Sequence, residues 1–219
     1  MKPEEIAKKY NINLEKFEKE QEKLAKQLEI KDSIDFSLSE RIAAVDNSFF
    51  QNKIISACVV FSPELEILEQ EYFSDKMRFP YISGFRAYRE LPSMLQAFNK
   101  LEEKPDITFV PGQGIAHPRL GVASHFSIST GVPSIGIANS LLVGEIKGKD
   151  ILLEGKKVGK VLQSKPGSKP MFVSPGNFIS IETAYELAKK FIKLPHKLPE
   201  PLHLAHKYAK EIRKEIFSS

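Results

Sequence analysis

Hydrophobic residues recur every three or four positions from Pro3 to Ile30, between many Lys and Glu residues. This spacing places them on one face of an amphipathic helix, with a break expected near residues 11–13. A loop rich in Ser and Asp follows from Asp32 to Ser39. We therefore expect residues 1–35 to form a helical extension that packs on the main body.

The next part of the chain carries apolar runs that are typical of buried strands. Strands are predicted over Arg41–Asp46, Lys53–Phe61 and Leu65–Phe73, and the first of them is expected to end in a carboxylate. The last two are linked by Ser62-Pro63-Glu64, a turn sequence with proline at its second position. Such short links favour an antiparallel meander.

Strand and helix patterns alternate from Asp106 to Ala138, which implies parallel pairing of the two strands there. The predicted elements are a helix over Gly84–Lys100, a strand over Asp106–Val110, a helix over Leu120–Thr130, a strand over Ser134–Ala138, short β segments within 151–174, and helices at about 181–192 and 203–216. An antiparallel half that feeds a parallel half is the strand order of ribonuclease H-like folds. We predict an α/β fold with a mixed sheet of this type, flanked by helices, and one domain over residues 36–219.

The composition excludes several classes of protein. No apolar run approaches the ~20 residues that cross a bilayer, and the charged N-terminus lacks the apolar core of a signal peptide. We therefore expect a cytoplasmic protein that does not contact a membrane. The one cysteine, Cys58, excludes an internal disulfide framework and a cysteine-cluster zinc site. Because it lies in an apolar run, we expect a buried, inert thiol.

Charge is unevenly distributed along the chain. Residues 1–30 carry seven Lys and seven Glu, whereas residues 147–219 carry fifteen Lys or Arg against seven Asp or Glu. This excess fits a surface that meets a phosphate backbone, and it fits a well-solvated Lys-rich face equally well.

Asp46 is the first candidate for chemistry. It directly follows Ile-Ala-Ala-Val, and an ionised Asp in that place is expensive to bury without a partner. Two interpretations stay open at this point. Asp46 is a ligand for a divalent cation, or it caps the strand and hydrogen-bonds the turn at Asn47-Ser48.

Residues 110–119 read Val-Pro-Gly-Gln-Gly-Ile-Ala-His-Pro-Arg, which resembles the central block of the endonuclease V family. These nucleases cut a strand one bond away from a deaminated base, typically hypoxanthine. Residues 79–92 (FPYISGFRAYRELP) resemble the family segment in which a Tyr-centred wedge opens the nucleic acid and a Glu reaches the metal site. Further similar blocks follow in the family's order at 121–125, 133–138, 172–177 and 198–201, so the resemblance covers about 36–216.

The resemblance implies a Mg²⁺-dependent hydrolase, with Mn²⁺ as the alternative ion, acting on DNA or RNA that carries inosine. Asp46, Glu90 and His206 would be catalytic, and Asp46 and Glu90 would hold the ion, since a hard cation prefers oxygen ligands. Tyr81 would be the wedge that fills the hole left by a flipped base, although the residue alone fits half-buried packing too. The remaining base-pocket and nucleic-acid contacts would be Gly84, Gly112, Gln113, Gly114, His117, Arg119, His125 and Asn139.

The histidines have alternative interpretations. His117 and His125 are either polar core residues with satisfied hydrogen bonds or contacts to the nucleic-acid strand. His196 and His203 are expected at the surface.

Several positions depart from the family pattern, and three of them bear on the chemistry and the pocket. Pro111 stands where the family has a metal-binding Asp, Asn139 replaces a Lys that helps to neutralise the reacting phosphate, and Arg86 replaces an apolar residue. Two hypotheses follow: a metal-dependent endonuclease, or a catalytically impaired paralogue that binds inosine-containing or distorted nucleic acid without efficient cleavage. The oligomeric state is not fixed by the sequence, and a monomer is favoured.

Overall fold

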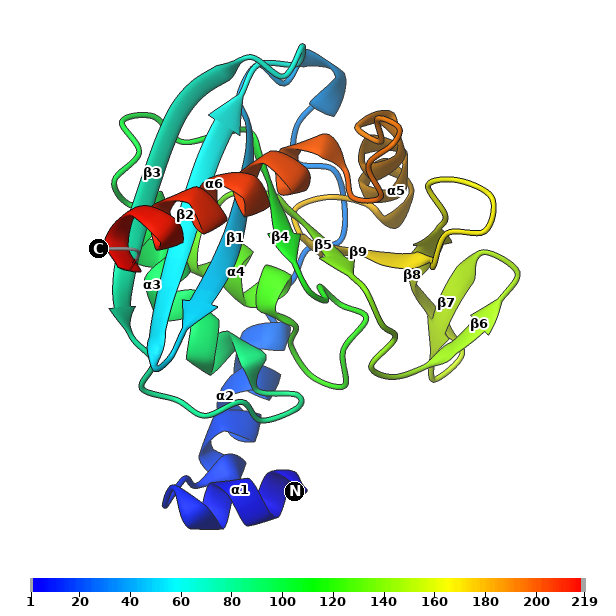
Figure 1. The fold of residues 1–219 in the computed structure, drawn as a ribbon. Coiled ribbons are helices and arrows are strands. Elements are labelled where there is room, and N and C mark those ends of the chain that lie inside the picture. The colour runs from blue at the N-terminus through cyan, green and yellow to red at the C-terminus, as the bar shows by residue number, and fades with distance from the viewer. Residues whose placement is uncertain (1, 218–219) are drawn as a thin grey trace.

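A nine-stranded sheet runs through the computed structural model, which describes residues 2–217 (Figure 1). The helices are α1 (Pro3–Lys9), α2 (Leu14–Ala25), α3 (Arg86–Phe98), α4 (Val122–Thr130), α5 (Ile181–Lys190) and α6 (Glu200–Phe217), with a 3₁₀ turn at Phe36–Leu38. The strands are β1 (Ile42–Phe50), β2 (Lys53–Phe61), β3 (Ile67–Lys76), β4 (Ile107–Pro111), β5 (Ser134–Ala138), β6 (Glu145–Lys147), β7 (Asp150–Leu153), β8 (Lys156–Leu162) and β9 (Met171–Asn177).

The pairing of the strands confirms the predicted mixed sheet. Its order is β3-β2-β1-β4-β5-β9-β8-β7-β6. The first three strands form an antiparallel meander, and β4 and β5 add to β1 in parallel. From β5 onward, through β9 to β6, the pairing is antiparallel again.

The first strand is longer than predicted, and this changes the position of Asp46. Strand β1 continues to Phe50, with Asp46 opposite Ala57 and Phe50 opposite Lys53. Asp46 therefore lies within the strand, and its interpretation as a cap on a turn at Asn47-Ser48 is wrong. The strand continues past Asp46 because Ser48 and Phe49 pair with Ile55 and Ile54, the apolar residues near the start of β2.

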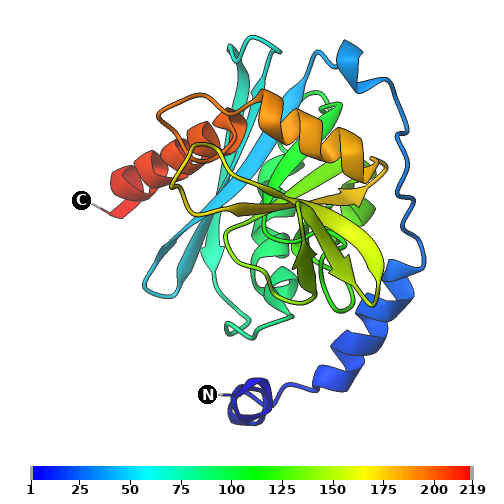
Figure 2. The same cartoon turned by 90° about the vertical axis from the view of Figure 1, so that its right-hand side faces the viewer.

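Helices cover both faces of the sheet. Helix α6 crosses one face over β1 and β2, while α3 and α4 lie on the opposite face (Figure 1). Helix α5 packs on β8 and β9, on the same side as α6 (Figure 2). Side chains of β1 alternate accordingly: Ala44 belongs to the core under α5 and α6, and Val45 to the core under α3 and α4. Asp46 then points toward α6 and Asn47 toward α3.

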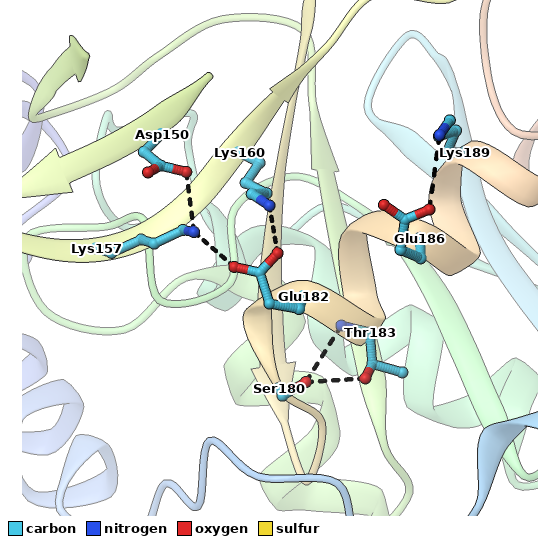
Figure 3. Close-up of polar contacts among 8 residues, drawn as sticks. All are labelled: Asp150, Lys157, Lys160, Ser180, Glu182, Thr183, Glu186 and Lys189. Atoms are coloured by element: carbon cyan, nitrogen blue, oxygen red, sulfur yellow. Dashed lines mark hydrogen bonds and ion pairs between the residues drawn. The ribbon is translucent and has the colours of Figure 1, made fainter. Parts of the chain in front are cut away.

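Ion pairs hold α5 over the far end of the sheet (Figure 3). Glu182, in the first turn of α5, pairs with Lys157 and Lys160 of β8, and Lys157 also lies 2.9 Å from Asp150 of β7. Ser180 caps the helix by accepting a hydrogen bond from the Thr183 N–H at 3.2 Å. Each exposed pair contributes little alone, so this network mainly orients α5.

The N-terminal helices break where predicted, since Asn13 caps α2 by accepting from the Lys16 N–H. Helix α2 is tied to the body by Gln21, which is fully buried. Its amide donates to the carbonyls of Gly84 and Leu120 at 3.1 and 3.2 Å and accepts from Arg119 Nε at 2.8 Å. One side chain thus joins α2 to two loops of the main body.

Cys58 is fully buried in β2, as predicted. Burial raises the pKa of its thiol far above the ordinary value, and the charges of Glu69 and Glu71 act in the same direction. Within residues 2–217, the helices are too short or too polar to traverse a bilayer.

We expect Gln21→Ala to destabilise the fold by about 1–3 kcal/mol, because the carbonyls of Gly84 and Leu120 and the Nε of Arg119 lose their hydrogen-bond partner. Gln27→Ala, an exposed glutamine just beyond α2, is the matched control and should change stability by less than about 0.5 kcal/mol. Urea unfolding midpoints measure both. Equal midpoints for the two variants would mean that the Gln21 contacts contribute nothing to the folded state.

Candidate nucleic-acid site

A cavity of about 460 Å³ opens where β4 and β5 end, between α3 and α6. The carboxyl ends of parallel strands are a common place for ligand sites in α/β folds. Eight of the predicted site residues line it: Asp46, Tyr81, Gly84, Gly112, Gln113, His117, Asn139 and His206. Glu90, Gly114, Arg119 and His125 lie outside this lining.

Glu90 is buried behind the cavity wall, with 3% of its surface exposed. Arg86 lies one turn earlier on α3 and binds both carboxylate oxygens, through Nε to Oε1 at 2.6 Å and through Nη2 to Oε2 at 2.9 Å. The Asn47 amide also donates to Oε2 at 2.8 Å, and Ser56 donates to the Asn47 Oδ1 at 2.5 Å. The carboxylate is therefore neutralised and fully hydrogen-bonded by the protein itself.

The Arg86 guanidinium lines the cavity as well as binding Glu90. Burial acts to lower the pKa of Arg86, but the hydrogen bond and charge of Glu90, with smaller contributions from Asp46 and Tyr81, raise it above the ordinary value. A Cβ at Gly112 would lie 2.9 Å from Nη1 of Arg86, so the glycine leaves room for the guanidinium. The sequence showed only that Arg86 replaces an apolar residue of the family pattern, and it gave no sign of the ion pair with Glu90.

Asp46 meets α6 on the other side of the cavity. Its Oδ2 lies 2.6 Å from Nδ1 of His206. The carboxylate accepts, so Nδ1 carries the proton and Nε2 is directed away from Asp46. The two predicted residues are therefore brought together, across the strand from the Arg86–Glu90 pair.

Lys197, in the loop before α6, contributes a charge that sequence reasoning missed. Its Nζ donates to Oδ1 of Asn139 at 3.0 Å. Asn139 itself lines the cavity, so a lysine reaches the position where the family pattern places one, although it comes from a distant part of the chain.

The glycine block is shaped by close backbone packing. A Cβ at Gly114 would lie 2.0 Å from the Pro175 carbonyl, and Gly112 has a φ of +132°. The N–H groups of both glycines donate within the protein, to the Ile137 carbonyl and to Ser174 Oγ, each at 2.8 Å. Gln113 lies between the two glycines and lines the cavity, and its side-chain amide donates to the Ser140 carbonyl at 3.1 Å.

His117 and His125, for which a core position and a strand contact were both left open, are buried, and burial lowers the pKa of each to about 4. His117 faces the cavity, and its Nδ1 accepts from the Arg119 N–H at 3.1 Å. His125 packs edge-on against Tyr88, and its Nδ1 has no partner among residues 2–217. The expectation of satisfied hydrogen bonds is therefore wrong for His125.

Arg119 and Tyr81 both lie at the loop that precedes α3. Arg119 binds Gln21 and Glu18 of α2 and lies over the Phe85 ring at 4.8 Å, so it supports the loop before α3 instead of lining the cavity. Tyr81, at the cavity's edge, is 61% exposed. Half-buried packing does not describe this side chain, because most of its ring faces solvent.

The cavity does not fit a Mg²⁺ ion. Mg²⁺ demands several oxygen ligands in a near-octahedral arrangement. Both oxygens of Glu90 are bound by Arg86, Asp46 is paired with His206, and Pro111 supplies no side-chain oxygen. The guanidinium already provides the positive charge that an ion would bring.

Comparisons with known proteins give one consistent result. The family model described as Endonuclease V matches residues 22–207. The chain is 39% identical to Endonuclease V of Thermosipho melanesiensis over 80% of this chain and 81% of that protein, and 34% identical to Endonuclease V of Archaeoglobus fulgidus over 94% and 96%. Among solved structures, the catalytic domain of human Endonuclease V matches with a TM-score of 0.84 at 28% identity, covering 94% of this chain and 97% of that one. Ciona intestinalis Endonuclease V, in complex with a DNA containing an inosine followed by a ribo-adenosine, matches with a TM-score of 0.84 at 25% identity, covering 93% and 98%.

Removal of the Arg86 guanidinium should cost about 3 kcal/mol in Arg86→Met, because the buried Glu90 carboxylate loses its counter-charge. The double variant Arg86→Met/Glu90→Gln should recover most of this loss, since a neutral amide needs no counter-ion. Denaturant unfolding of the four proteins in this cycle gives the coupling energy. A coupling below about 0.5 kcal/mol would show that the pair does not stabilise the fold.

Acid should destabilise the protein through His125. Its pKa is lowered by burial to about 4 in the folded chain and is about 6.5 when unfolded, so the unfolded chain binds more protons between these values. The neutral ring contributes to the free energy of unfolding. This contribution is fully present above pH 6.5 and is lost as pH falls toward 4, by up to about 1.4 kcal/mol per pH unit. In His125→Gln, the slope of unfolding free energy against pH should be reduced by about one proton over this window. If the slope in His125→Gln equals that of wild type, the acid sensitivity comes from groups other than His125.

Proposed function

The chain belongs to the endonuclease V family, and on that premise we propose that it binds nucleic acid at a deaminated base, inosine or deoxyinosine, without efficient metal-dependent cleavage. The observation that carries the proposal is the bidentate Arg86–Glu90 pair, which fixes a protein cation beside the cavity. The Ciona relative crystallised with inosine-containing DNA supports the choice of ligand.

The cavity suits a flipped nucleotide. Its volume of about 460 Å³ lies within the usual range for small-molecule sites. Gln113 offers amide groups that can pair with the O6 and N1–H edge of hypoxanthine. Tyr81, exposed at the rim, is placed to fill the space that the base leaves in the stack.

A positive group at the cavity suits the flanking phosphates. Lys197 is bound to the neutral amide of Asn139, so its charge is available to a phosphate, whereas the charge of Arg86 is balanced by Glu90. His117 and His206 add imidazole groups to the lining. This arrangement supplies affinity for the backbone without a divalent ion.

Cleavage would need a water activated at neutral pH and charge neutralised on the leaving oxygen. The family's bound metal supplies that chemistry, and the residues present here do not fit it. We therefore assign Arg86, Lys197 and His206 to binding and charge neutralisation, and no hydrolytic step to this chain.

A second candidate function is metal-dependent cleavage by the same site. The Asp46–His206 pair and the replacement of a family lysine by Lys197 favour it, since both retain groups expected around a reacting phosphate. Dependence on Mg²⁺ separates the two functions.

Inosine-containing oligonucleotides, as single- and double-stranded DNA and RNA, should bind wild type with the same Kd in EDTA, Mg²⁺ and Mn²⁺. Matched oligonucleotides with guanine or adenine in place of hypoxanthine are the ligand controls, and fluorescence anisotropy with gel analysis measures binding and cleavage together. We expect retention of inosine preference without cutting. Metal-dependent cutting by wild type that Asp46→Ala abolishes would establish the second candidate instead.

Restoration of cleavage should require two changes: release of Glu90 from Arg86, and a new metal ligand at position 111. Pro111→Asp/Asn139→Lys should stay inactive, because Arg86 still binds both Glu90 oxygens. Adding Arg86→Leu should give Mg²⁺-dependent cutting near inosine, at least ~100-fold above the double variant. If the double variant is as active as the triple, the Arg86 pair does not block the site.

A further inference from the structure

A second cluster of ligating side chains lies outside the cavity, where the α5–α6 loop enters α6. His196 Nδ1 lies 2.9 Å from Oε2 and 3.2 Å from Oε1 of Glu200. The rings of His196 and His203 stack with centroids 3.6 Å apart and planes 17° apart. One ligand atom from each of the three residues lies within 4.8 Å of the others. Both histidines are half-buried, so their expected surface positions are only partly correct.

The backbone holds these three residues in register. Glu200 and His203 are three apart on α6, which places them on one helix face. The loop is closed by a bridge between Ile192 and Pro199, and the Glu200 N–H donates to the Phe191 carbonyl at 2.8 Å. The Glu200 side chain is 12% exposed, whereas the His196 side chain is 37% exposed. The cluster is thus formed by the fold and remains open to solvent on one side.

None of the three side chains belongs to the cavity lining, and the proposed recognition of a base does not use them. Both carboxylate oxygens of Glu200 lie within 3.2 Å of His196 Nδ1, so the carboxylate is directed at that ring.

We propose that His196, Glu200 and His203 bind a borderline transition-metal ion of the Zn²⁺ type. Two imidazole nitrogens and one carboxylate oxygen are a ligand set for Zn²⁺, with the fourth position left to water, whereas Mg²⁺ takes oxygen ligands almost alone. Ligands at about 2.0–2.1 Å around a tetrahedral ion lie about 3.4 Å apart. The three atoms therefore need to approach by roughly 1.4 Å at most. The two rings also have to turn out of their parallel stack, because an imidazole nitrogen binds an ion in the plane of its ring.

An ion in this position would brace the wall of the cavity from behind. Lys197, next to His196 in the chain, binds Asn139. Leu202 and His206, on α6 beside His203, line the cavity. Metal binding would fix the loop and the first turn of α6, and so the position of these groups, without contact with the nucleic acid.

The test measures Zn²⁺ binding to the chelator-stripped full chain by calorimetry and thermal unfolding. We expect one Zn²⁺ per chain and, at a hundredfold excess over Kd, a rise in Tm of about 5–10 °C, with no comparable response to Mg²⁺. His196→Gln and His203→Gln should each weaken Zn²⁺ binding by at least ~100-fold. His125→Gln, the same substitution at a histidine of α4, should leave it unchanged.

Co²⁺ replaces Zn²⁺ as a spectroscopic probe in wild type, so the result does not depend on the folding of the variants. Visible absorption typical of a four-coordinate Co²⁺ with nitrogen and oxygen ligands supports the site. Zn²⁺ binding that survives His203→Gln, or that is lost in Asp46→Asn and not in His203→Gln, overturns the proposal and places the ion in the cavity. Absence of stoichiometric binding by wild type overturns it too.

Discussion

The buried carboxylate of Glu90 is the constraint around which the site is built. A carboxylate this far from water needs a positive partner and a full set of hydrogen-bond donors. Arg86 supplies the charge from one helical turn away, and Asn47 completes the donors from β1. The cation is the guanidinium of Arg86, a side chain of α3. It is therefore present at Glu90 whatever the concentration of metal ions in solution. The planar fork of the guanidinium also fixes the direction of the carboxylate, which a spherical ion would not do.

This pairing reaches into the surrounding elements. Ser56 holds Asn47 from β2, so the meander contributes directly to the orientation of the carboxylate. A Cβ at Gly112 would lie 2.4 Å from Cγ1 of Val122 and 2.9 Å from Nη1 of Arg86, so the glycine leaves room for both side chains. The loop that precedes Arg86 is held by Gln21 at the Gly84 carbonyl. Helix α2, the loop before α3 and the cavity wall therefore form one connected structure.

The periodicity of apolar residues was sufficient to predict nearly every element and the mixed pairing of the sheet. It failed at the end of β1. The strand continues through Asp46 to Phe50 because these residues pair with β2, and a local sequence pattern does not show that pairing. Site residues were predicted where a motif is continuous in sequence. The Lys197–Asn139 contact joins residues 58 apart, and Arg86 was visible as a charge without any sign of where it points. Long-range side-chain pairing of this kind is decided by tertiary packing.

Cys58 lies in the middle of β2, opposite Val45 of β1 and Glu71 of β3, and is fully enclosed. Thiolate formation is suppressed by burial, so an alkylating reagent can react with it only when this part of the sheet opens. No other cysteine competes for the reagent. The rate of labelling at this single atom consequently reports the free energy of opening of the central sheet, and a cysteine introduced at the surface could carry a fluorophore without protection of the native thiol.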